Sequence, residues 1–123
     1  MKTWTDKLTY NYPLMFVDRW ALPTVLEGWH PIVERVCAFI AKHDLNNEVK
    51  VVQVKEKLAG LRFYYYIKDT SSELYTNIEE VVRAAEIEAS KTCEYCGAPG
   101  KMVGKGWVKT MCEPCALKAF KKR

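Results

Sequence analysis

The chain has 123 residues, of which 49% are hydrophobic and 28% charged, so it can bury one modest core. Its apolar runs are short and interrupted by charge, and its first residues, "MKTWTDKLTY", contain no apolar stretch of signal-peptide length. These features argue against a membrane span and against secretion, and the expected compartment is the cytoplasm, where paired cysteines stay reduced.

The N-terminal region of about 22 residues is rich in aromatic residues and proline, as in "NYPLMFVDRWALP". We expect it to wrap the core as loop, short turn or edge strand. A helix is predicted in "GWHPIVERVCAFIAKHDL", because Gly28 and Pro31 mark a helix start and apolar residues recur at helical spacing. These residues are Trp29, Ile32, Val33, Val36, Phe39 and Ile40. The predicted helix therefore faces the core, and it ends at Asn46 and Asn47.

A β-hairpin is predicted in "EVKVVQVKEKLAGLRFYYYIKD", where two strand-like runs flank a tight turn near residues 57–60. A two-stranded hairpin alone is marginal in water. It must therefore pack on the helices or gain a third strand from the N-terminal region.

The second strand of this hairpin, "LRFYYYIK", has two different sides. Alternation places Leu61, Phe63, Tyr65 and Ile67 on one side, and Arg62, Tyr64, Tyr66 and Lys68 on the other. Joined by Lys55 and Lys57, the second side combines cations with aromatic rings and is suited to stacking bases and holding phosphates. The alternative is that helices cover this side, or that it forms a protein interface.

A second helix is predicted in "TNIEEVVRAAEIEASK", where Thr76 and Glu79 form a capping box. Its apolar face comprises Ile78, Val81, Val82, Ala85 and Ala89. Residues 1–92 are thus predicted to form an α+β body in which two helices pack with the hairpin.

The last 31 residues contain two Cys-x-x-Cys pairs, Cys93 with Cys96 and Cys112 with Cys115. "CEYCG" is typical of a zinc knuckle, and the "GKG" turn between "KMV" and "WVKTM" predicts a hairpin that folds the second pair back onto the first. The second pair opens a predicted helix. The pattern predicts a treble-clef-like zinc finger with four cysteine ligands over residues 93–123.

A redox dithiol is the competing interpretation of these cysteines, but that chemistry uses one pair on a βαβ scaffold. Four thiolates complete the coordination shell of one Zn²⁺, so the predicted ion is structural. Residues 1–90 carry a formal charge of −2 and residues 91–123 of +6, which the metal site reduces to about +4. The basic tail therefore attracts phosphates only weakly. The fifth cysteine, Cys37, is expected to be a buried apolar residue.

No catalytic motif accompanies the cysteines. His30 and His43 lie at opposite ends of the first predicted helix, and the pairs Glu79/Glu80 and Glu86/Glu88 are expected on a solvated helix face. The chain contains no Gly-rich phosphate loop, Gly-x-Ser-x-Gly elbow or His-Glu-x-x-His pair. We therefore expect a protein that is not an enzyme.

"GWHPIVE", "VVQVKEKLAGLRFYY" and "CEYCGAPG…GWVKTMCEPC" together resemble small uncharacterised proteins of bacteria and their phages, over roughly residues 28–116. The resemblance implies a zinc-binding protein of phage or mobile-element origin. The finger alone is similar to that of the DksA and TraR regulators, which implies a transcriptional role. "GAPG" stands here where those regulators have Gly-x-Pro-Ile, and their long coiled coil is absent.

The first functional hypothesis is a zinc-stabilised adaptor or inhibitor that binds a host protein, for example a defence component, with Trp107, Tyr64 and Tyr66 as anchors. The alternative is a nucleic-acid-binding or transcription-regulating protein that uses the basic finger and the Arg62/Tyr64/Tyr66/Lys68 side of the hairpin. A thiol enzyme is the third hypothesis. The sequence leaves the oligomeric state open.

Overall fold

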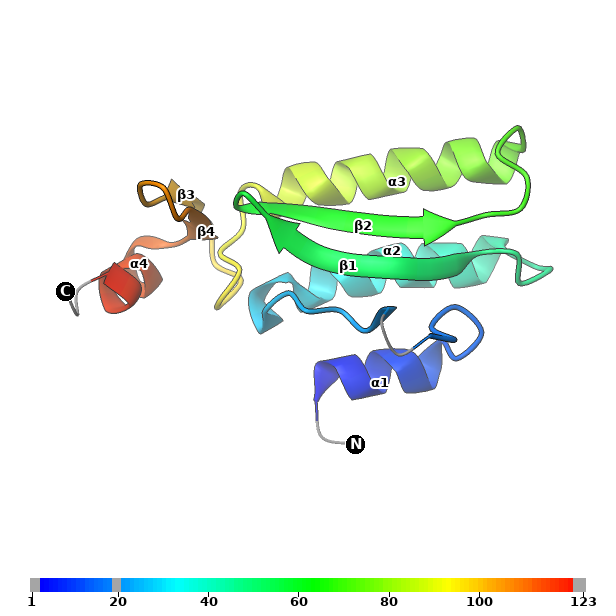
Figure 1. Cartoon of the computed structure of the whole chain (residues 1–123), viewed down its shortest axis with the longest axis horizontal. Helices are drawn as coiled ribbons and strands as arrows, with labels where there is room; N and C mark the ends of the chain where they lie inside the picture. The colour runs from blue at the N-terminus through cyan, green and yellow to red at the C-terminus, as the bar shows by residue number, and fades with distance from the viewer. Residues whose placement is uncertain (1–2, 19–20, 121–123) are drawn as a thin grey trace.

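The computed structural model describes residues 3–18 and 21–120 (Figure 1), and within them it has the predicted α+β composition. Four helices accompany two antiparallel hairpins in these two ranges. The body contains α1 (Trp4–Asn11), a 3₁₀ turn (Glu27–Trp29), α2 (His30–His43), β1 (Lys50–Lys57), β2 (Gly60–Tyr66) and α3 (Glu73–Ala89). The C-terminal finger contains β3 (Lys101–Val103), β4 (Lys109–Met111) and α4 (Glu113–Phe120).

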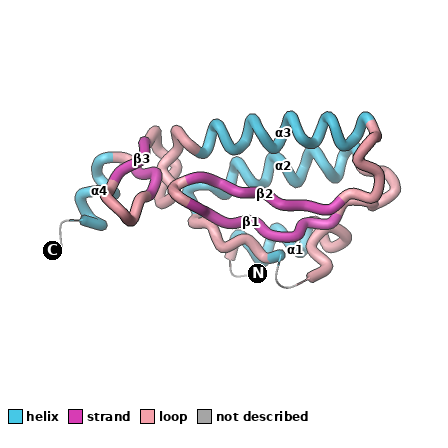
Figure 2. Tube along the Cα trace, turned by 45° about the horizontal axis from the view of Figure 1, so that its top comes forward, coloured by secondary structure: helices cyan, strands magenta, loops and turns pink. Residues whose placement is uncertain are grey.

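The body has two layers. Helices α2 and α3 cover one side of the β1–β2 hairpin, and α1 lies beside α2 (Figures 1 and 2). The core between the layers comprises Ile32, Val33, Val36 and Ile40 of α2, Val51 and Val54 of β1, Leu61 and Phe63 of β2, and Ile78, Val82, Ala85 and Ala89 of α3. The helical spacing in both segments and the strand alternation were therefore correct guides to burial. No helix covers the opposite side of the hairpin in the described part of the chain.

The N-terminal region differs from the expectation of loop, turn or edge strand, because residues 4–11 form α1. The Thr3 hydroxyl caps this helix by accepting a hydrogen bond from the Asp6 amide at 3.1 Å. Leu8, the buried residue of the helix, fixes it to the core. The cap satisfies an end donor and the core contact stabilises two turns that are too short to persist alone.

The chain after α1 covers the outer edge of β1. The Val51 amide donates to the Met15 carbonyl at 2.9 Å, and the Thr24 amide donates to the Val54 carbonyl at 3.0 Å. The described residues of this segment form no regular strand, but these two bonds supply part of what a third strand would supply. The hairpin is thus supported both by the helices and along one edge.

The turn between β1 and β2 is a strained one. Leu58 and Ala59 have φ angles of 52° and 69°, in the left-handed region that favours glycine. Each non-glycine residue there costs on the order of 1–2 kcal/mol. The Glu56 carboxylate accepts from the Ala59 amide at 2.8 Å, and the Thr110 hydroxyl of the finger donates to the Ala59 carbonyl at 2.6 Å. The turn is therefore held by one contact from β1 and one from the finger.

Helix α3 begins earlier than its predicted capping box. Its N-cap is Ser72, whose hydroxyl accepts from the Tyr75 amide at 3.1 Å. Thr76 lies inside the first turn and donates to the Ser72 carbonyl at 3.4 Å, so the Thr76/Glu79 box is wrong. The turn formed by Asp69 and Ser71 ends the preceding loop early, which places Ser72 at the start of the helix.

Three hydrogen bonds join residues 26–29, directly before α2, to residues 92–94 at the start of the finger. The Gly28 amide donates to the Glu94 carbonyl at 2.8 Å, and the Leu26 amide donates to the Glu94 carboxylate at 3.1 Å. The fully buried Trp29 indole donates to the Thr92 carbonyl at 2.8 Å. The predicted body and finger therefore meet in a polar, largely buried junction.

Lys109 is the charged centre of this junction. Its ammonium lies 2.6 Å from the Glu94 carboxylate and 3.3 Å from the Glu56 carboxylate. The side chains of Lys109 and Glu94 are only 10% and 1% exposed. Burial alone would lower the pKa of Lys109, but the two carboxylates outweigh burial and raise it, so the ammonium stays charged.

Replacing Gly28 by alanine is expected to destabilise the protein by about 1–3 kcal/mol or more. A Cβ at this position would lie 2.2 Å from the Cys93 carbonyl oxygen and 2.5 Å from the Glu94 carbonyl oxygen, so the finger would have to move. Gly60→Ala is the matched control, because its Cβ would meet at 3.1 Å only the flexible end of Arg62. Denaturant unfolding of both variants measures the difference, and equal stability would contradict the described junction.

Lys109→Met is expected to cost about 3–5 kcal/mol, because it leaves the buried Glu94 carboxylate without a counter-charge. Adding Glu94→Gln removes that charge and should recover a substantial part of the loss. The measurement is the free energy of unfolding of the single and double variants in a double-mutant cycle. A single variant as stable as the parent chain would show that the ion pair has no role at the junction.

Candidate metal centre and cationic face

The four cysteines of the two Cys-x-x-Cys pairs meet at one point in the finger. Their sulfur atoms all lie within 4.8 Å of one another, and the Cys96 and Cys112 sulfurs are 3.5 Å apart. Four sulfurs at about 2.3 Å from a tetrahedral ion are separated by about 3.8 Å. None of the four is in a disulfide. The cluster therefore has the size and donor set of a site for one metal ion.

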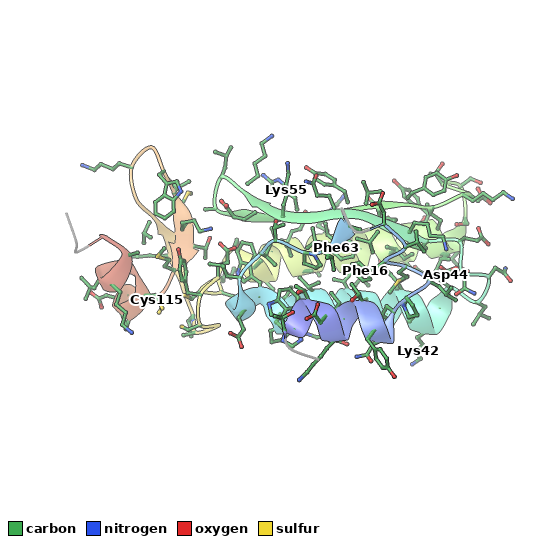
Figure 3. The ribbon with its side chains drawn as sticks, turned by 60° about the horizontal axis from the view of Figure 1, so that its bottom comes forward. Phe16, Lys42, Asp44, Lys55, Phe63 and Cys115 are labelled. Atoms are coloured by element: carbon green, nitrogen blue, oxygen red, sulfur yellow. The ribbon has the colours of Figure 1, made fainter. Side chains whose placement is uncertain are left out.

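The local fold brings the two pairs together as the sequence predicted. Cys93 and Cys96 lie in the loop after α3, where the Cys93 amide donates to the Ala98 carbonyl and Gly97 adopts a φ of +87°. Strands β3 and β4 pair in an antiparallel hairpin, with Cys112 directly after it and Cys115 in the first turn of α4 (Figure 3). The Glu94 amide donates to the Thr110 carbonyl at 2.9 Å and so joins the first pair to β4.

Backbone amides point at the knuckle sulfurs. Burial opposes ionisation of the Cys93 thiol, but hydrogen bonds from the amides of Cys112, Cys96 and Tyr95 outweigh it and lower the pKa of Cys93 to about 6. Hydrogen bonding to the Cys112 sulfur, together with burial and the nearby Cys93 thiolate, raises the pKa of Cys115 to about 12. An ionised thiol in this cluster thus opposes ionisation of its neighbour. A divalent cation is what allows four sulfurs to carry charge together.

The finger has a small apolar core of its own. Its buried members are Cys93, Met111 and Cys112, with Ala98, Val103, Cys115, Ala116 and Ala119 packed against them. Two of its three buried members are themselves candidate ligands. So little apolar area cannot offset the entropy of ordering some 30 residues, so a metal ion held by the four cysteines would add stability that this core does not supply.

The other cysteine and the two histidines are not part of this centre. Cys37 is completely buried in the core on α2, as expected, and burial followed by the nearby Glu34 charge raises the pKa of its thiol. His30 stacks on Trp4, and His43 contacts the Phe39 carbonyl through Nδ1. They lie at the first and last positions of α2.

Two glutamates of α3 that were expected on a solvated face have specific partners. Glu79 accepts from the Tyr65 hydroxyl at 2.6 Å, and Glu88 binds Arg35 of α2 at 2.6 Å. The hydrogen bond from Arg35 lowers the pKa of Glu88. Both carboxylates thus help to join α3 to its neighbours.

The uncovered side of the β1–β2 hairpin is the second candidate site. Strand register and burial place on it the residues that we call the cationic face: Lys50, Gln53, Lys55, Lys57, Arg62, Tyr64 and Tyr66. Tyr64 is 44% exposed and Tyr66 is 57% exposed. Lys55 projects from the hairpin on the side away from the helices, while Phe63 lies on the helix side (Figure 3). The expected alternation along β2 is therefore present: Tyr65 faces α3, and among the described residues no helix covers Tyr64 or Tyr66.

Two residues predicted for the binding surface lie apart from this face. Lys68 follows the end of β2 and lines a mixed-charge pocket with Asn46, Glu48 and Asp69. Trp107 is 55% exposed in the loop between β3 and β4. Lys121, Lys122 and Arg123 of the basic tail lie outside the described residues.

The Glu56–Lys109–Glu94 group was missed by sequence reasoning. Glu94 lies between two predicted ligands and Lys109 lies in a short strand, so the sequence predicts an exposed charged side chain at each position. The two residues meet only through the tertiary fold of the finger. The only signal in the sequence was their opposite charge, because all three residues of β4 are buried and no alternation marks Lys109.

Comparisons of the chain with family models, with curated proteins and with solved structures find no match. Among the described residues, no helix is both long enough and apolar enough to span a membrane.

The metal centre predicts a pattern of thiol reactivity. The metal-loaded chain should bind one ion and react slowly with a thiol reagent, and a chelator should expose four reactive thiols, because Cys37 stays buried in the core. Titration with the reagent, before and after chelation and then in denaturant, measures this. Cys37→Ala should remove only the thiol that denaturant exposes. Four fast thiols in the metal-loaded chain would contradict the site.

Proposed function

We propose that this chain is a zinc-stabilised nucleic-acid-binding protein without enzymatic activity, and that the cationic face is its binding surface. In this proposal the finger is a treble-clef-like, four-cysteine site with a structural Zn²⁺. The finger supports the hairpin that carries the face, and the four cysteines take no part in a reaction.

The choice of zinc rests on the donor set. Tetrahedral four-sulfur sites are typical of Zn²⁺ or of iron centres, and a knuckle followed by a hairpin and a helix start is typical of zinc fingers. Four protein ligands leave no position for a bound water, which supports a structural rather than a catalytic ion. Binding of about 10–16 kcal/mol then contributes to the folding of the finger.

The observation that carries the binding proposal is the charge of the cationic face. It presents four cations, Lys50, Lys55, Lys57 and Arg62, with two exposed tyrosines and no carboxylate. Residues 1–90 nevertheless carry a net charge of −2. The acidic residues gather in the helical layer: α3 alone has five glutamates against one arginine. This segregation favours a polyanionic partner for the hairpin.

A host protein is the second candidate partner, in the phage or mobile-element setting that the sequence resemblance implies. Exposed apolar side chains on the finger favour it: Met102 is 61% exposed and Trp107 is 55% exposed. Exposed aromatic residues of this kind often anchor protein interfaces. This surface is separate from the cationic face, so the two candidates predict different sensitive residues.

Nucleic-acid binding is expected to weaken steeply with salt, because cations of the face displace counterions from phosphates. With three to four contacts, the slope of log K against log salt should be about −2 to −3 for a single strand. Lys55→Gln with Lys57→Gln should reduce its magnitude by about 1.4, because two phosphate contacts are lost. Lys42→Gln, on the exposed side of α2, is the matched control.

Fluorescence anisotropy with labelled oligonucleotides at several salt concentrations measures these slopes. No binding of any oligonucleotide by the metal-loaded chain would overturn the proposal. Together with capture of a host protein that Trp107→Ala abolishes, that result would establish the second candidate.

A further inference from the structure

We propose, building on the nucleic-acid function above, that the cationic face binds single-stranded nucleic acid by stacking two neighbouring, unstacked bases on Tyr64 and Tyr66. Lys55, Lys57 and Arg62 then contact the phosphates of the same strand. The ligand class is defined by the spacing and the surroundings of the two tyrosines.

The spacing of the two tyrosines is larger than the spacing of stacked bases in a nucleic acid. They are two residues apart on one side of β2, so their Cα atoms are separated by about 6.6–6.8 Å along the strand. Successive bases of a stacked strand are about 3.4 Å apart. Two neighbouring bases can lie on both rings only if they are pulled apart, which a single strand allows at low cost.

The pairing of β1 with β2 places three cations beside the two tyrosines, where the backbone of a bound nucleic-acid strand would continue. Arg62 is opposite Lys55, and Lys57 follows at the turn, so three cations occupy one half of the face while the tyrosines occupy the other. Lys50, opposite Tyr66, already donates to the Leu14 carbonyl at 2.8 Å. Gln53 is opposite Tyr64 and offers an amide donor and acceptor beside that ring. The face thus provides separate places for bases and for phosphates.

The surroundings of the hairpin disfavour a duplex. A two-stranded ribbon can enter a major groove about 12 Å wide only if it projects freely. Here the N-terminal segment is bonded to the β1 edge at Met15 and Thr24, and the finger lies beyond the turn. In addition, the base faces that tyrosines stack on are hidden within a duplex.

The experiment uses the metal-loaded full chain and two labelled probes, an oligothymidylate of about 10 nucleotides and a duplex of the same length. We expect the single strand to bind at least about tenfold more tightly than the duplex. Tyr64→Ala and Tyr66→Ala should each weaken single-strand binding by about 5- to 150-fold, the range that corresponds to loss of one stacked base.

Matched variants separate stacking from folding. Tyr64→Phe and Tyr66→Phe keep the ring and should retain binding, whereas Tyr64→Leu keeps apolar bulk and should lose it. Tyr10→Ala removes a tyrosine of α1 that is more exposed than either of these two and should change nothing. Thermal unfolding of each variant identifies any loss that arises from instability, and the phenylalanine variants then decide the role of the ring.

The outcomes distinguish this inference from the function on which it rests. Salt-sensitive binding that the lysine variants weaken, with the duplex bound as tightly as the single strand, would overturn the single-strand inference and leave nucleic-acid binding in place. The same holds if the leucine variant binds as well as the parent. Failure of both probes to bind overturns the proposed function itself.

Discussion

The structure depends on one buried charge, the Lys109 ammonium between the carboxylates of Glu94 and Glu56. Glu56 lies near the end of the first strand of the body hairpin, Glu94 lies in the cysteine knuckle, and Lys109 begins β4. An ammonium in this position is stable only while both carboxylates remain in place. It therefore fixes the angle at which the finger meets the hairpin more strictly than apolar packing alone would.

The hydrogen bonds of Thr110, next to this charged group, connect the cysteine cluster to the hairpin that carries the cationic face. Thr110 bonds the hairpin turn through its hydroxyl, and its carbonyl accepts from the Glu94 amide. Cys112 follows Thr110 by two residues and Cys93 directly precedes Glu94, so a candidate ligand lies beside each partner of this bond. The contacts of Thr110 thus help to hold the turn and join it to the segment that carries the four cysteines.

The sequence predicted those features whose signals are local. Helical spacing located α2 and the buried side of α3, alternation located the two sides of β2, and the Cys-x-x-Cys spacing located the four cysteines that cluster in the finger. The start of α3 was misplaced because Ser72 and Thr76 are both good caps, and only the turn at Asp69 decides between them. Helix α1 was missed because two turns carry too weak a period, and its stability comes from Leu8 in the core. The junction was beyond local reasoning, since it joins residues more than 50 positions apart.

The left-handed turn at Leu58 and Ala59 has a further consequence for motions within the native state. The turn is unfavourable by itself and is held both by Glu56 of its own strand and by the Thr110 hydroxyl, so opening of the finger removes one of its two side-chain contacts. This contact couples the two segments, although 51 positions separate Ala59 from Thr110 in the sequence. Loss of this contact should therefore speed the exchange of amide hydrogens at the hairpin tip with solvent. The stability of the tip thus depends in part on the segment that carries the four cysteines, although the tip itself contains none of them.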